Sequence, residues 1–241
     1  MSVSVTRTGT RIAASCLSTS GSATASELAG VPDTATPLNL GPTLVEWHGA
    51  QRWIKATPAD ATILNLTPQQ ILGLRGLELP SRVRRSLARW RYGSAVFKVD
   101  FHLSEPVPWT DPRVGQAGTV HVGGTVEEIC RAEGDVGKRR MPERPLVVVC
   151  QQYVADPSRG LTLWTYAHVP RGYAERYPGE VTELITAQIE RFAPGFRDTI
   201  LATHATSPAE LERWNPNLVG GDIAGGSMTG LQTLLRPRLS P

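Results

Sequence analysis

Apolar and polar residues alternate strictly along two stretches in the middle of the chain, residues 97–103 and residues 161–169. Because neighbouring side chains of a β-strand point to opposite faces, each stretch predicts a strand with one apolar face. The short run 119–122 and the continuously apolar run 146–150 predict two further strands. We expect the strand at 146–150 to be central in the sheet, because both of its faces are apolar.

A helical pattern follows these strands. Apolar residues recur with the 3.6-residue period of an α-helix and stop before Pro194-Gly195; they are Val181, Leu184, Ile185, Ile189 and Phe192. A lone helix of this length is marginal in water, so we expect it to cover one face of the sheet. Residues 200–204 predict another short strand, and Ser207-Pro208-Ala209-Glu210 has the capping-box pattern that begins a helix.

Three elements are predicted before the sheet. Residues 61–66 predict a short buried strand, and Thr67-Pro68-Gln69-Gln70 has the residue types that begin a helix. A second helix is predicted from about Ser81 to Tyr92, with Val83, Leu87 and Trp90 on one side and Arg82, Arg84, Arg85 and Arg89 on the other. The whole order of elements predicts an α+β fold, with an antiparallel or mixed sheet covered by helices.

Residues 1–40 differ in composition from the rest of the chain. Ser and Thr dominate as far as Ser26, and Arg7 and Arg11 are the only charged residues before Glu27. A segment of this kind is typical of a low-complexity, disordered tail, and we expect it to be mobile. An acidic-poor transit peptide is the alternative, but no helical stripe supports it.

Composition and motifs exclude several classes of protein. The net charge of +3 is too small to argue for nucleic acid, and no apolar run approaches the roughly 20 residues of a membrane-spanning helix. Cys16, Cys130 and Cys150 contain no CxxC pair, which fits a reducing, cytoplasmic location. HExxH is absent, so we expect no local metal site, and no two glycines are two residues apart, which removes the GxGxxG dinucleotide motif.

Two groups of residues are candidates for ligand contact. Paired glycines flank Asp222-Ile223-Ala224, and they let the backbone approach either a flat ligand or another strand; the candidates are Gly220, Gly221, Asp222, Gly225 and Gly226. Trp164, Tyr166 and His168 share one face of a predicted strand and are candidates for a pocket wall, with a core role for the two aromatic residues as the alternative. Lys98, Asp100 and His102 alternate in the same way, and we expect them to face water rather than a pocket.

Several motifs in this order resemble the phytoene-desaturase-like FAD-dependent oxidoreductases of the amine-oxidase superfamily. They are Asn65-Leu66-Thr67-Pro68, Tyr92-Gly93, Phe97-Lys98-Val99-Asp100, Pro106–Trp109, Gly118–Gly124, Arg191–Phe196, and Asn215–Gly226 with Gln232 and Arg236-Pro237. The resemblance spans residues 60–238. It implies a two-domain flavoenzyme that oxidises or desaturates apolar, carotenoid- or lipid-like substrates by hydride transfer to FAD.

The chain departs from the family pattern at both ends. It lacks the GxGxxG segment and the closing flavin motif, so the resemblance implies a truncated or split member whose front was lost or frame-shifted. We expect residues 41–95 to be a remnant of the flavin domain, 96–214 the substrate domain, and 215–241 a return segment toward the flavin domain. FAD is then expected to bind weakly or not at all unless a separate polypeptide supplies its domain.

Catalytic residues are not identifiable from the sequence, and whether the chain alone is an enzyme is left open. Two alternatives to a flavoenzyme also stay open: a non-enzymatic remnant that binds apolar ligands, and a partner-binding α+β domain. The arginine-rich segment 82–91 leaves a peripheral membrane contact open as well.

Overall fold

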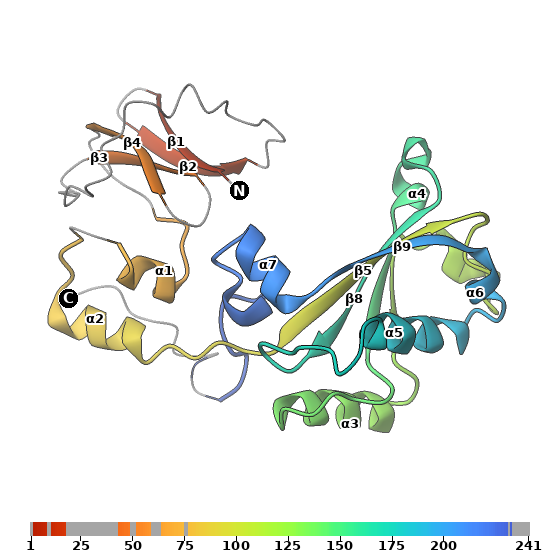
Figure 1. Ribbon diagram of the computed structural model, residues 1–241. Helices are drawn as coiled ribbons and strands as arrows, with labels where there is room; N and C mark the ends of the chain where they lie inside the picture. Colours follow the sequence, from red (N-terminus) through yellow and green to blue (C-terminus); the bar gives the residue numbers. More distant parts are fainter. Residues whose placement is uncertain are drawn as a thin grey trace. The chain divides into compact units, whose positions relative to one another are not determined.

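The computed structural model describes residues 2–8, 11–17, 43–48, 52–58, 64–74, 77–230 and 232 (Figure 1). The chain forms two compact units. The first comprises residues 1–91, 212–219 and 228–241, and the second comprises residues 92–211 and 220–227. Each unit is described by itself below.

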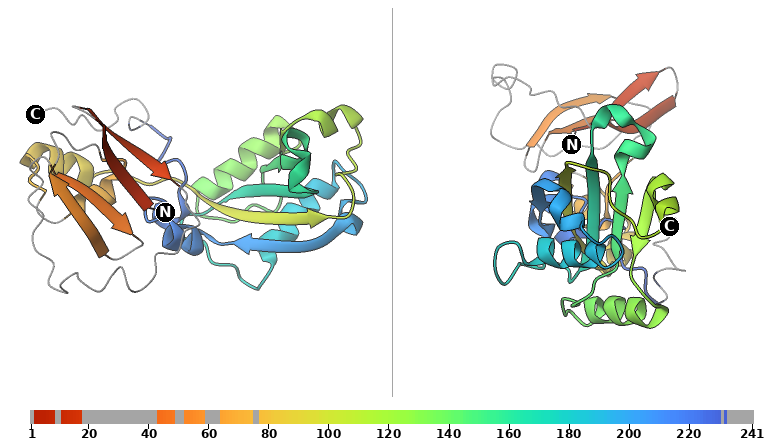
Figure 2. Two further views of the ribbon diagram at one scale, coloured as in Figure 1. Left: turned by 90° about the horizontal axis from the view of Figure 1, so that it is seen from above. Right: turned by 90° about the vertical axis from the view of Figure 1, so that its right-hand side faces the viewer.

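The second unit is built on a five-stranded sheet in the order β6-β7-β8-β5-β9. Its strands are β5 (Ala95–Leu103), β6 (Thr119–Val122), β7 (Val147–Gln151), β8 (Thr162–Val169) and β9 (Ile200–Thr206). Every neighbouring pair is antiparallel, and β5 and β9 run side by side in Figure 2. The predicted α+β fold is therefore confirmed, and its sheet is antiparallel.

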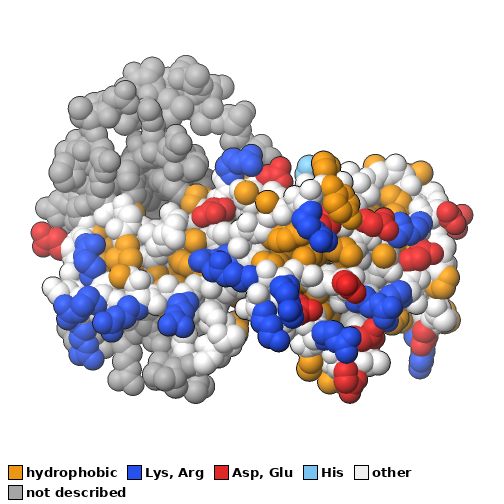
Figure 3. Space-filling view, turned by 60° about the horizontal axis from the view of Figure 1, so that its bottom comes forward, with side chains coloured by type: hydrophobic (Ala, Val, Ile, Leu, Met, Phe, Trp, Pro, Cys, Tyr) orange, Lys and Arg blue, Asp and Glu red, His pale blue; other side chains and the backbone are white. Residues whose placement is uncertain are grey.

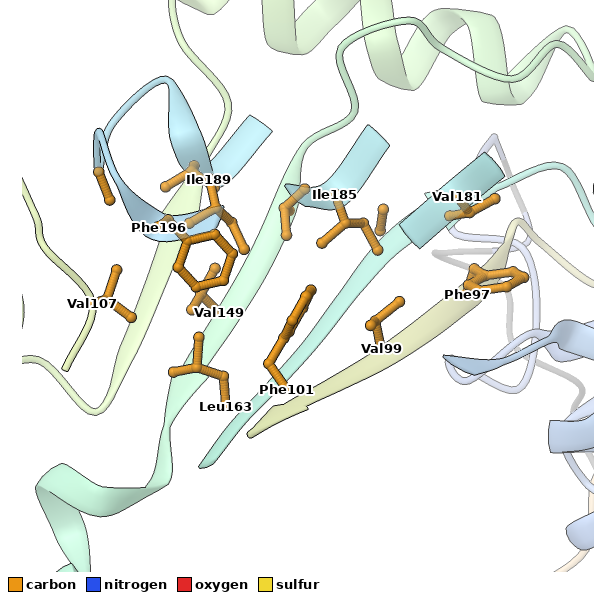
Figure 4. Packing of buried hydrophobic residues seen from close by; sticks show 14 of the residues in the cluster. Phe97, Val99, Phe101, Val107, Val149, Leu163, Val181, Ile185, Ile189 and Phe196 are labelled. Atoms are coloured by element: carbon orange, nitrogen blue, oxygen red, sulfur yellow. The ribbon is translucent and has the colours of Figure 1, made fainter. Parts of the chain in front are cut away.

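Helix α5 (Glu180–Glu190) covers one face of this sheet. Val181, Ile185 and Ile189 are fully buried and point toward the strands in Figure 4. The strands contribute the apolar positions of their alternating pattern, among them Phe97, Val99, Phe101, Val149 and Leu163. The ring of Phe101 meets that of Phe196 edge-on, with centroids 5.4 Å apart. The predicted helical stripe thus supplies the core on this face.

Helix α3 (Val126–Gly137) was not predicted. It begins with a capping box, in which the Thr125 hydroxyl accepts from the Glu128 N–H and the Glu128 carboxylate accepts from the Thr125 N–H. Its buried residues are Ala132 and Val136, and with the half-buried Ile129 they recur at helical spacing. The Thr-x-x-Glu spacing was the signal that could have located it.

The remaining helical segments of this part of the chain are short. They are the helices α4 (Gln152–Ala155), α6 (Phe196–Thr199) and α7 (Pro208–Trp214), and the 3-10 turns Pro112–Gln116, Pro157–Arg159 and Val219–Gly221. The predicted capping box of α7 is formed: the Ser207 N–H donates to Glu210 and the Glu210 N–H donates to the Ser207 hydroxyl.

The first unit contains a four-stranded antiparallel sheet in the order β2-β1-β3-β4. Its strands are β1 (Ser2–Thr8), β2 (Arg11–Leu17), β3 (Thr43–His48) and β4 (Arg52–Pro58). The sequence analysis had not predicted these strands. The expectation that residues 1–40 are mobile stays a prediction, as does the four-part division of the chain, and residues 18–42 lie outside the described residues.

Two helices of the first unit, α1 (Pro68–Leu72) and α2 (Ser81–Ala88), begin where the sequence places them, but α2 ends at Ala88 and not at the predicted Tyr92. The predicted strand at 61–66 is wrong for Leu64–Leu66, which are irregular, and its first three residues lie outside the described residues. A short apolar run indicates burial rather than a strand, and Leu64 and Leu66 are indeed half-buried.

The start of α1 is held by a distant segment instead of by its own cap. The Thr67 hydroxyl makes no capping bond. The Thr67 N–H donates to the Asn217 side chain at 2.9 Å, and the Gln70 side chain donates to the Pro216 carbonyl at 2.7 Å. Residues from the Asn-Pro-Asn segment therefore complete this helix end within the first unit.

None of the described helices has both the length and the apolar character needed to cross a bilayer.

The packing of α5 on the sheet can be tested by truncation. We expect Ile185→Ala and Ile189→Ala each to lower the free energy of unfolding by about 2–5 kcal/mol, because each removes a fully buried side chain. Val126→Ala is the control, since Val126 is a helical residue that is 71% exposed, and it should change stability by less than about 0.5 kcal/mol. Urea unfolding measures all three; losses below about 0.5 kcal/mol at both isoleucines would contradict the packing.

Candidate functional site

The face of the five-stranded sheet opposite α5 is the candidate site, and we call it the aromatic face. It is defined by Trp164, Tyr166 and His168 on β8, Lys98 and Asp100 on β5, and Val148 and Cys150 on β7. The register places Trp164 between Cys150 and Asp100, and Tyr166 between Val148 and Lys98. All but Val148 are half-buried, so this face is partly accessible to solvent.

The three rings on β8 form a continuous row. The ring centroids of Trp164 and Tyr166 lie 5.3 Å apart with planes at 73°, an edge-to-face arrangement. The centroids of Tyr166 and His168 lie 6.0 Å apart with planes at 39°. Such geometry stabilises an aromatic pair by about 0.5–1.5 kcal/mol beyond the burial of its surface. The structure thus brings the three predicted pocket-wall residues together into one row of rings in mutual contact.

Charged side chains lie beside this row. Lys98 and Asp100 form an ion pair with each other, and the Lys98 ammonium lies 5.9 Å from the centroid of the Trp164 ring. Their side chains are only 22% and 37% exposed, whereas His102, further along the same strand, is exposed. The expectation that all three face water therefore holds for His102 alone, because the neighbouring strands place aromatic rings beside the other two.

A carboxylate from α3 reaches the end of the aromatic row. His168 Nδ1 lies 3.0 Å from both carboxylate oxygens of Glu133. This hydrogen bond raises the pKa of His168 above its ordinary value of 6.5, although burial opposes the shift, and the charges of Glu133 and Asp222 add to it. Burial raises the pKa of Tyr166 as well, so its hydroxyl stays a protonated hydrogen-bond donor at neutral pH. The sequence did not identify Glu133 as a candidate site residue, because the helix that carries it was not predicted.

The glycine-rich loop is hydrogen-bonded to the residues just before β5. Asp222 is 1% exposed, and its carboxylate accepts from the Gly93 N–H at 2.6 Å and from the Ala224 N–H at 2.7 Å. Both of its oxygens are thus occupied by the backbone of the same unit. Asp222 is a candidate for ligand contact in the sequence; in the structure its carboxylate links the loop to Gly93, and contact with a ligand stays a prediction.

Close approach of the chain to itself explains the glycines of this loop. At Gly221, where φ is +86°, a Cβ atom would lie 2.6 Å from the Pro208 Cβ and 3.0 Å from the Ala95 Cβ. At Gly93, a Cβ atom would lie 3.2 Å from the Ser227 Cα. These close approaches are to the chain itself, at the first residue of α7, the first residue of β5 and the glycine-rich loop, and whether the loop also contacts a flat ligand stays a prediction.

The resemblance implies FAD, whose pyrophosphate needs backbone N–H groups at a helix N-terminus. At α3, α5 and α7 of the second unit these N-terminal ends are occupied by the chain's own carboxylates, and the four-residue helix α4 has no side-chain cap. Glu128 caps α3, Glu175 accepts from the Val181 N–H of α5 at 2.8 Å, and Glu210 caps α7. A pyrophosphate would have to displace a like-charged group at each of them. The residues described in this unit therefore do not fit the pyrophosphate of FAD.

Comparison with protein families and curated proteins, and a search for metal-binding clusters, assign no function to this site. No protein-family model matches the chain, and no curated protein is significantly similar to it. Among the described residues, no group of three or more His, Cys, Asp or Glu side chains is placed to hold a metal ion. The antiparallel sheet therefore has one face packed against α5 and one half-buried aromatic face. The hydrogen-bonded pair of His168 and Glu133 lies at one end of the aromatic row.

The pairing of His168 with Glu133 predicts a specific titration. We expect His168 to titrate above pH 6.5 in the folded protein, and Glu133→Gln to lower its pKa, because the charge that favours the imidazolium is removed. Glu127→Gln on the same helix is the control and should leave the titration unchanged. Imidazole proton NMR measures the three proteins.

The same pair has a stabilising effect with a defined pH dependence. Because the folded pKa of His168 is raised, the stabilisation is fully present below about pH 6.5, the unfolded value, and is lost as the pH rises through the folded pKa. An unchanged His168 pKa in Glu133→Gln would show that the pair does not form in solution.

Proposed function

We propose that this chain is the substrate-binding half of a FAD-dependent oxidoreductase, and that the aromatic face holds an apolar, carotenoid- or lipid-like substrate. The observation that carries the proposal is the half-buried row of Trp164 and Tyr166 on the sheet face opposite the α5 core. Rigid aromatic rings offer a large apolar surface with little loss of conformational entropy on binding. The order of family-like motifs along the chain supports the same function.

The chain's own residues have separable roles in this proposal. Trp164, Tyr166 and Val148 provide the apolar surface against which an extended molecule lies. Lys98 and Asp100 neutralise each other, so they border the site without imposing a net charge on an apolar ligand. His168, held by Glu133, marks one end of the row with a group that can donate a hydrogen bond or a proton.

The flavin-binding half of the oxidoreductase belongs, in this proposal, to a separate polypeptide. The absence of GxG spacing in the sequence and the self-capped helix ends of the second unit support this division. The missing GxG spacing and the self-capped helix ends also favour a second candidate function. In it the chain is a non-enzymatic protein that binds apolar molecules on the aromatic face. The two functions share the ligand site and differ in whether a flavin-bearing partner completes it.

Ligand binding to the aromatic face can be tested with retinol, an apolar polyene, as the probe. We expect retinol to quench tryptophan fluorescence saturably, and Trp164→Ala to weaken binding by at least about tenfold, which corresponds to about 1.4 kcal/mol. Trp214→Ala is the matched control, because Trp214 is 58% exposed, lies on α7 and is not one of the residues that define the aromatic face. Equal weakening by both variants, or by neither, would overturn the proposed site.

Binding of the flavin is tested by comparing FAD with riboflavin, which lacks the pyrophosphate. We expect the chain alone to bind FAD with a dissociation constant above about 1 μM, and no more tightly than riboflavin, because the chain's own carboxylates occupy the N-terminal ends of α3, α5 and α7. Fluorescence titration of the purified chain measures both constants. FAD binding that is at least tenfold tighter than riboflavin binding would reveal a pyrophosphate site and place the whole activity on this polypeptide.

A further inference from the structure

The arginine-rich helix of the first unit carries a cluster of exposed charges that the aromatic face does not include. Within and just after α2, five arginines occur among ten residues: Arg82, Arg84, Arg85, Arg89 and Arg91. All five side chains are exposed, and none forms an ion pair with another residue in the described part of the chain. We call these five residues the arginine patch; its blue side chains gather at the lower left of Figure 3.

The patch has a fixed outward direction because the opposite side of α2 is anchored. Val83 and Leu87 are each 3% exposed. At about 100° per residue, Arg82, Arg85 and Arg89 fall within about 60° of arc on the side away from these two residues. Their guanidinium groups therefore face outward together along a helix about 12 Å long, which suits contact with a surface rather than insertion of the helix into a groove.

Charge is divided unequally between the two units. Of the chain's 25 Lys and Arg residues, 13 lie in the first unit and 12 in the second, whereas its 22 Asp and Glu residues divide into 6 and 16. The first unit thus has a net charge of +7 and the second of −4, which the overall value of +3 conceals. An anionic surface attracts the first unit and repels the second, so it would favour one orientation of contact.

Apolar residues next to the patch distinguish between two anionic partners. Leu77 and Leu79 precede α2 and Trp90 follows it, and all three are half-buried. Arginine mixed with leucine and tryptophan is typical of contact with the headgroup and acyl boundary of a bilayer, where tryptophan is enriched. The edges of nucleic acids offer no comparable apolar layer. We propose that the arginine patch docks the protein peripherally on anionic phospholipid membranes.

The test uses the full chain and vesicles without retinol, so its outcome does not depend on the aromatic face. Sedimentation should show binding to phosphatidylcholine vesicles that contain phosphatidylglycerol, and little binding to vesicles of phosphatidylcholine alone. Binding should be largely lost at 1 M salt, where the Debye length falls to about 3 Å. The triple variant Arg82→Gln/Arg85→Gln/Arg89→Gln should bind about 100-fold more weakly, from about fivefold for each arginine.

A matched triple variant separates the patch from net charge. Arg131→Gln/Lys138→Gln/Arg139→Gln removes the same charge from exposed positions of the second unit and should change binding by less than about threefold. Circular dichroism on both variants checks that they fold, since none of the six side chains is buried. Equal losses in both variants would overturn the proposal. Equal binding to both kinds of vesicle, or binding to a DNA duplex with none to the anionic vesicles, would overturn it too.

Discussion

The burial of a single helical stripe against one face of the five-stranded sheet determines what the other face can be. Val181, Ile185 and Ile189 lose all contact with water on that face, and each contributes about 1.5–3 kcal/mol. Because side chains alternate along a strand, fixing Leu163 in the core fixes Trp164 on the opposite face. A slip of one residue would exchange the two faces, so the core also specifies the aromatic face.

Periodicity was enough to predict the sheet and the helix that covers it, because these elements are amphipathic with regular spacing. Helix α3 was missed although Ile129, Ala132 and Val136 recur at helical spacing, and with it the contact between His168 and Glu133, which lie 35 residues apart. Periodicity also failed at Leu64–Leu66, where a short apolar run indicated burial without defining the backbone. Sequence periodicity reports which face is buried, whereas pairing between distant side chains depends on tertiary packing.

The glycine-rich loop shows that a glycine motif predicts close approach of the backbone more readily than it predicts which group approaches. Two glycine pairs around Asp222 predict close approach, and the sequence does not specify what approaches. In the structure the buried Asp222 carboxylate binds the Gly93 N–H, so residues 129 positions apart form one fastening at the start of β5. This contact joins two of the motifs on which the family resemblance rests, Tyr92-Gly93 and Asn215–Gly226. The hydrogen bond ties the glycine-rich loop to the residues just before β5.

The central claim is that an apolar molecule lies on the aromatic face, and two cysteines allow a direct test. Cys150 is half-buried beside Trp164, and Cys130 is exposed on α3; neither is in a disulfide. Alkylation by iodoacetamide, followed by mass spectrometry of the two peptides, should show Cys150 slowed at least about tenfold by saturating retinol while Cys130 reacts at an unchanged rate. Unchanged alkylation of Cys150 under saturation, or equal slowing of both cysteines, would contradict the claim.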